Sequence, residues 1–280
     1  MSATQIGQNL AFINWTVLTG LGLGSYATVV LLQRRTTVTP GYLRFTAICA
    51  LAFGFLAWLS DGALPAASLG QSPVVVDPTW DAPRRAALGL FCAVVAAGLV
   101  AGRLGPRPRA TIQAAGMVAA AATLLFGALA WGGGSLGTAA LLVQLAIASG
   151  VTGGVFAAMI LGHWYLVTPK LAEAPLILLA RVLFGLVVVQ VVLFWAWVAT
   201  GAGPADVAPF AALVGPWALF VWLRLVVGLV FPLIVSWAAV QTARSRSMES
   251  ATGLLYINVG SIAAGTILAA GLYFGAGLLV

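Results

Sequence analysis

Eight apolar segments, each long enough to cross a bilayer, constrain the fold of this chain more than any other feature. They cover residues 9–33, 42–60, 86–102, 110–131, 138–166, 175–200, 218–241 and 251–279. A helix needs about 20 mostly apolar residues to span the hydrocarbon core, and in lipid only helices and closed barrels satisfy their own backbone hydrogen bonds. The sequence therefore predicts an all-α polytopic membrane protein with eight transmembrane helices.

The scarcity of charge excludes a water-soluble fold. Only 7% of the 280 residues are charged and 62% are hydrophobic, whereas a soluble domain has roughly 25% charged residues. The mean hydropathy is +1.08. The net charge of +7 does not indicate a nucleic-acid partner, because most of the 13 Lys and Arg residues lie in short connections between apolar segments.

The distribution of charge over the connections predicts the orientation in the membrane. The first, third, fifth and seventh connections and their borders hold most of the basic residues: Arg34, Arg35, Arg44, Arg103, Arg107, Arg109, Lys170, Arg244 and Arg246. The other connections hold Arg84 and Arg85, together with Asp61, Asp77, Asp81 and Asp206. Basic loops stay in the cytoplasm, so both termini are expected outside the inner (plasma) membrane. The first eight residues contain no Lys or Arg, so the first segment is expected to be a retained span rather than a cleaved signal.

Matches between the two parts of the chain predict an internal repeat. Gly20 and Gly24 recur 130 residues later as Gly150 and Gly154, and RAALGL (85–90) resembles RLVVGL (224–229). We therefore expect two related four-helix halves, residues 1–132 and 133–280, with a binding site between them. The alternative is that these matches arise by chance in a chain rich in Ala, Gly and Leu. In either case, the spacing of the four glycines predicts close approach of helices.

Polar residues near the outer ends of several spans form one candidate site. A quinone pocket needs an apolar slot, one or two hydrogen-bond donors and a route for protons. Residue types that suit this role are Asn14, Trp15, Asp61, Gln144 and Arg224. Arg224 has an alternative interpretation, in which its guanidinium reaches the interface or binds backbone carbonyls.

A second candidate site lies near the inner ends of the fifth and sixth spans. It comprises His163, Trp164, Tyr165 and Arg181 and could contact a quinone or a lipid head group. The alternative is that these are ordinary interfacial side chains. His163 is the only histidine, which excludes a haem with two histidine ligands and a histidine-rich metal site within this chain. We find no catalytic motif and expect no metal.

One family combines these properties. The segment Trp15–Tyr26 (WTVLTGLGLGSY) is similar to the first span of the membrane anchors of molybdopterin oxidoreductases, and Trp222-Leu-Arg224 resembles their seventh span. These anchors include the membrane subunits of dimethyl sulfoxide reductase and polysulfide reductase. The resemblance implies a quinone pocket on the outer side and an iron–sulfur or cytochrome partner bound there. The chain departs from the family pattern because the outer histidine of some members is missing, and His163 lies on the opposite side.

Three hypotheses of function follow. The first is a non-catalytic integral subunit of a redox complex, such as a quinone-linked oxidoreductase, that anchors partner subunits in the lipid bilayer. The second is a transporter or channel with its pathway between the two halves. The third is a purely structural subunit of a respiratory or photosynthetic assembly. The sequence leaves all three open.

Overall fold

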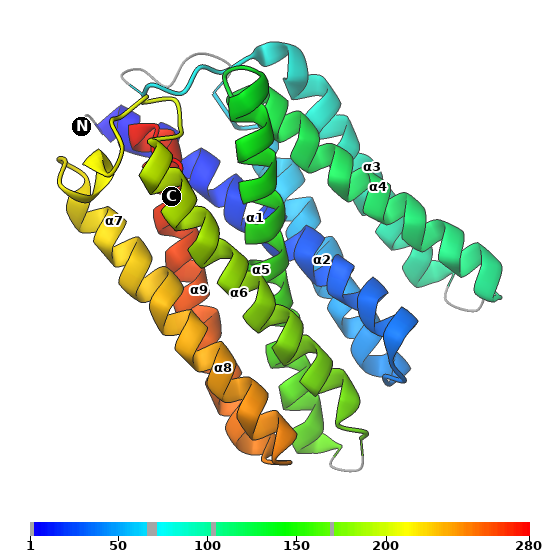
Figure 1. The fold of residues 1–280 in the computed structure, drawn as a ribbon. Coiled ribbons are helices and arrows are strands. Elements are labelled where there is room, and N and C mark those ends of the chain that lie inside the picture. The colour runs from blue at the N-terminus through cyan, green and yellow to red at the C-terminus, as the bar shows by residue number, and fades with distance from the viewer. Residues whose placement is uncertain (1–2, 66–71, 102–104, 169–170) are drawn as a thin grey trace.

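A computed structural model describes residues 3–65, 72–101, 105–168 and 171–280 (Figure 1). In this part of the chain, eight helical segments are long and apolar enough to cross a membrane, and no strand is formed. The predicted all-α class and the number of spans are therefore confirmed. The basic residues Arg103 and Lys170, and residues 66–71 of the second connection, lie outside the described residues.

Seven of the spans are each a single helix and the remaining one has three parts. The single helices are α1 (Ala3–Arg35), α2 (Pro40–Asp61), α3 (Asp81–Val100), α4 (Pro106–Trp131), α5 (Ser135–Val167), α6 (Ala174–Thr200) and α9 (Met248–Ala276). The seventh span runs through α7 (Ala218–Leu225), the π-helical turn η3 (Val226–Val230) and α8 (Phe231–Arg244). Two short 3₁₀ helices, η1 (Pro78–Trp80) and η2 (Ala211–Leu213), lie in the connections.

The third span begins earlier than its hydropathy indicates. We predicted a start at residue 86, with Arg84 and Arg85 in the preceding connection, but α3 begins at Asp81. An acidic residue in the first turn is favoured by the positive end of the helix dipole, and Pro83 is tolerated there because the first-turn amides have no intrahelical acceptor. Both arginines are therefore helical residues.

Pro232 explains the π-helical turn in the seventh span. Proline has no amide hydrogen, so the carbonyl of the residue four positions earlier loses its usual donor. That carbonyl belongs to Gly228, within η3, and it accepts a hydrogen bond of 3.1 Å from Nη1 of Arg224. The structure therefore accommodates this proline with a π-helical turn whose free carbonyl accepts a hydrogen bond from a buried arginine.

Helices α1 and α5 form the centre of the bundle. In their most apolar windows, 72% and 61% of residues are buried, compared with 22–39% in the other spans. Helix α1 packs on α2 and α5, while α5 also packs on α6 and α9. Both ends of the chain lie toward the same end of the bundle, here called the N/C end (Figure 1).

The two central helices touch through small residues. A β-carbon on Gly24 would lie 2.9 Å from Cα of Gly153 and would collide with the carbonyl of Ser149. Oγ of Ser25 donates a hydrogen bond of 3.3 Å to the carbonyl of Gly153. The prediction of close approach is confirmed for Gly24. It is wrong for Gly154, which has open space beside it, because the neighbouring Gly153 makes the contact.

Candidate functional site

A buried ion pair links α2 and α3 at the N/C end. Nε of Arg84 lies 2.7 Å from Oδ2 of Asp61, and only 1% of Arg84 and 6% of Asp61 is exposed. Nε1 of Trp15 in α1 donates a hydrogen bond of 2.8 Å to the same carboxylate oxygen. Nη1 of Arg84 lies 2.7 Å from Oδ1 of Asp81, whose side chain is 34% exposed. The carboxylate of Asp61 therefore holds three helices together, and Arg84 connects it to a carboxylate at the surface.

Aromatic rings shield this ion pair from lipid. The guanidinium carbon of Arg84 lies 4.7 Å from the ring centre of Trp131 and 5.9 Å from that of Trp15. The two indoles meet edge to face at 4.8 Å, and both are almost completely buried. A desolvated cation over an indole face is stabilised by roughly 2 kcal/mol. We call Trp15, Asp61, Asp81, Arg84 and Trp131 the Asp61 cluster.

Asn14 lies beside this cluster on an exposed face of α1. Its side chain is exposed, and its Nδ2 donates a hydrogen bond of 2.8 Å to Oγ of Ser60. Successive residues of α1, Asn14 and Trp15, thus bind successive residues of α2, Ser60 and Asp61. The structure brings together three of the five predicted outer residues.

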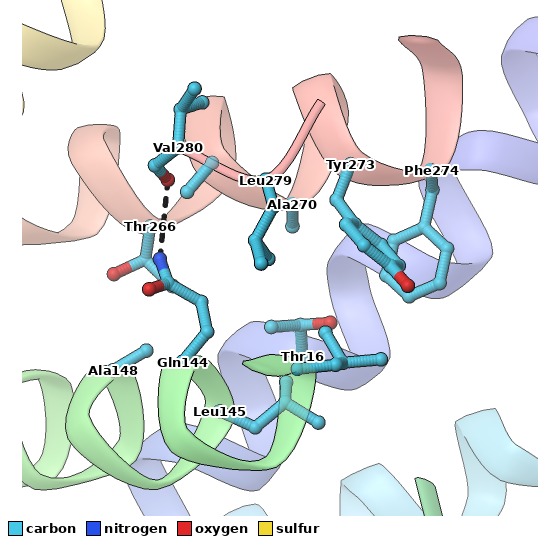
Figure 2. Close-up of a pocket in the computed structure, with 12 residues that line it drawn as sticks. Thr16, Gln144, Leu145, Ala148, Thr266, Ala270, Tyr273, Phe274, Leu279 and Val280 are labelled. Carbon is cyan, nitrogen blue, oxygen red and sulfur yellow. Dashed lines mark hydrogen bonds between the residues drawn. The ribbon is translucent and has the colours of Figure 1, made fainter. Parts of the chain in front are cut away.

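Gln144 lies at a small cavity that shares no residue with the Asp61 cluster (Figure 2). Its Nε2 donates a hydrogen bond of 3.1 Å to the carbonyl of Val280, and the cavity beside it has a volume of about 30 Å³. A cavity needs about 10–15 Å³ to hold one water molecule, so this one has room for roughly two. It is too small for a quinone ring, and Gln144 lines it together with Thr16 and Thr266.

Arg224 lies in the second half of the chain, where the seventh span crosses α9. It is 2% exposed, and β-carbons placed on Gly228 and Gly265 would lie 3.0 and 2.8 Å from its Nη1. The two glycines therefore make the space for the guanidinium. Its contact with the Gly228 carbonyl agrees with the alternative prediction that Arg224 binds the backbone.

The four predicted inner residues point to different neighbours. Trp164 packs against Tyr42 and Phe45 with ring centres 6.3 Å apart in each case. The hydroxyl of Tyr165 donates to the carbonyl of Ala172, and Arg181 is exposed on α6. These three side chains do not form a common site.

His163 is exposed and lies next to a polar side chain that the sequence analysis missed. Its Nδ1 lies 3.3 Å from the hydroxyl of Tyr256 in α9, which is also exposed. Substitution of an exposed residue that is not part of a buried network changes the free energy of unfolding by about 0.5 kcal/mol or less. We therefore expect His163→Ala to unfold within about 2 °C of the wild type in a thermal melt in detergent. A larger loss would mean that the His163–Tyr256 contact joins α5 to α9.

Arg84 and Trp131 are the main residues that the sequence analysis missed. Arg84 was assigned to a connection because the hydropathy of the third span rises only after Arg85. The spacing of Asp81 and Arg84, which are three residues apart, is the signal that could have placed both on one turn of a helix. Among the described residues, no three His, Cys, Asp or Glu side chains gather closely enough to bind a metal ion.

Neither the scan against protein-family models nor the search of curated proteins found a match. Its function must therefore be inferred from its own residues.

Proposed function

We propose that this chain is a non-catalytic integral subunit of a multi-subunit redox complex, with a quinone contact at the N/C end of the bundle. The charge bias of the connections assigns that end to the outside of the inner (plasma) membrane. An iron–sulfur or cytochrome subunit would bind there, next to the Asp61 cluster.

One observation supports this proposal above the others. The exposed amide of Asn14 lies next in sequence to Trp15, whose indole binds the buried Asp61, and Arg84 links Asp61 to the partly exposed Asp81. Buried charges in membrane helices are costly and usually mark sites of function. An exposed amide can donate to a quinone carbonyl, and a carboxylate close to it can accept a proton that quinol oxidation releases.

The alternatives differ in how they use the same contacts. Every bond of the Asp61 cluster named above is made within the chain. In a purely structural subunit, the cluster would have the single role of holding α1, α2 and α3 together. A transporter would need the halves to move against each other. The contact between Gly24 and Gly153 disfavours that movement at the α1–α5 interface, because packed backbones leave no side chain to rearrange.

Purification of the complex in mild detergent tests the proposal. We expect an iron–sulfur or cytochrome subunit and extractable quinone to copurify with the chain. Replacing Asn14 by Ala should lower quinol turnover about tenfold, because a lost hydrogen bond of ~1.4 kcal/mol has that effect on a rate. Gln241→Ala, which removes an exposed side-chain amide from α8 near the opposite end, is the matched control and should turn over quinol at the wild-type rate.

Two results would contradict the proposal in different ways. Full quinol turnover by the Asn14→Ala complex, with no quinone bound to the purified complex, would leave only the structural role. A quinone-free single subunit that moves a solute across liposomes would replace the proposal with the transporter.

A further inference from the structure

A half-open groove of about 240 Å³ lies between α1, α7 and α9 at the N/C end. One wall comes from Ile13 and Leu10 of α1, and the other from Phe220 of α7. Leu10 and Phe220 are 55% and 42% exposed, so the groove opens sideways to the surroundings of the bundle. We call it the lateral groove. It is separate from the small cavity at Gln144 and shares no residue with the Asp61 cluster.

The lateral groove is polar at one end and apolar along its depth. Asn9 lies near its outer end, beside Gly275, one residue before the end of α9. The other lining side chains are apolar or aromatic, and Trp217 stands at the start of α7, as expected of an interfacial anchor. A ligand that fits this gradient has a polar group at the interface and an apolar part toward the membrane centre.

The length of the lateral groove matches half of a bilayer. From Gly275 to Ile267 there are eight residues of α9, which is about 12 Å along the helix. One leaflet of the hydrocarbon core is about 15 Å thick. An extended chain can lie along a groove of this length from the interface almost to the midplane, with one side of the chain left open.

The floor of the lateral groove is made by glycine. A β-carbon on Gly271 would meet only Cδ1 of Ile13, at 3.6 Å, and one on Gly275 would meet Nδ2 of Asn9, at 3.5 Å. These are ordinary contact distances, so helix packing does not require glycine at either position. Glycine there instead leaves volume that a longer side chain would occupy.

We propose that the lateral groove binds one acyl chain of a phospholipid from the leaflet at the N/C end, with the ester region beside Asn9. Its volume lies below the roughly 300 Å³ of typical pockets for whole small molecules, so it accommodates a chain rather than an entire lipid or a ring with its tail. The bound chain lies between α1 and the α7–α9 pair, and thus joins the first helix to the last two spans. This site does not depend on the proposed quinone contact.

Native mass spectrometry of the delipidated protein, titrated with palmitoyl-oleoyl-phosphatidylcholine, tests the proposal. We expect the wild type to bind one lipid molecule tightly and to melt at a higher temperature once it is bound. Gly271→Leu places a side chain in the groove and should weaken lipid binding about tenfold or more. Displacing only two methylene groups of the acyl chain from the groove changes the dissociation constant by about this factor. The matched control is Gly260→Leu on the same helix, where the glycine is exposed and has open space around it.

A second variant keeps the test independent of how well Gly271→Leu folds. Phe220→Ala removes part of one wall without adding volume and should also weaken lipid binding and abolish the lipid-dependent rise in melting temperature. Equal binding by the wild type and all three variants would overturn the proposal. So would a tightly held quinone in place of the phospholipid, or a partner subunit that crosslinks to a cysteine introduced at Ile267 in the intact complex.

Discussion

Replacing Gly153 by alanine should prevent this protein from folding stably, although the change adds a single methyl group. The new β-carbon would lie 2.5 Å from Cα of Gly24 and would collide with the main chain of Ser25. Both neighbours are backbone of α1, so no side-chain rotation can relieve the overlap. The central helices must separate, and the cost should exceed the ~1–3 kcal/mol of ordinary overpacking.

Gly154→Ala is the control for this prediction. Gly154 follows directly in the same helix, and a β-carbon there has nothing within 4 Å. Alanine is also the better helix former, so this variant should be as stable as the wild type or slightly more stable. Once the partly exposed Cys49 is replaced by serine, a thiol-reactive dye can follow the unfolding of both variants, because Cys92 is buried and becomes reactive only on unfolding. Equal melting temperatures for the two variants would mean that α1 and α5 are not in backbone contact.

This contact marks the limit of what the sequence predicts about the fold. Hydropathy is a property of each segment, so the eight spans could be predicted with end errors of a few residues, as at Asp81. The spacing of Gly20 and Gly24 indicated that backbones approach each other. Which glycine of α5 they meet depends on the rotation and crossing of two helices, and no local pattern encodes that. The duplication of the two halves stays a prediction.

The candidate site could be predicted only in part, because the sequence shows which residues are polar but not which of them meet in the fold. Asn14, Trp15 and Asp61 were identified because polar side chains near the ends of apolar segments stand out. Gln144 and Arg224 stood out equally, yet they lie at other helix contacts. The lateral groove could not be predicted at all. Its residues come from three helices and are unremarkable apolar types, and only their packing leaves a space.

The ion pair of Asp61 and Arg84 allows the structural and functional roles of the cluster to be separated. Asp61→Asn keeps an oxygen for the indole of Trp15 but removes the charge that faces Arg84. Breaking a buried pair on one side typically costs about 3–5 kcal/mol, because the remaining charge has lost its partner. Arg84 retains only the partly exposed Asp81, so we expect Asp61→Asn to melt well below the wild type.

The double variant Asp61→Asn/Arg84→Met should recover most of that stability. Replacing both charges of a buried pair by neutral groups of similar volume is often neutral or stabilising, and Met can fill the space between Trp15 and Trp131. The melting temperatures of both single variants and the double variant form a cycle that isolates the coupling between the two side chains. If the site serves quinol oxidation, the double variant should be stable and assembled but inactive, because it has lost the carboxylate that accepts protons. Full turnover by a stable double variant would assign the ion pair to structure alone.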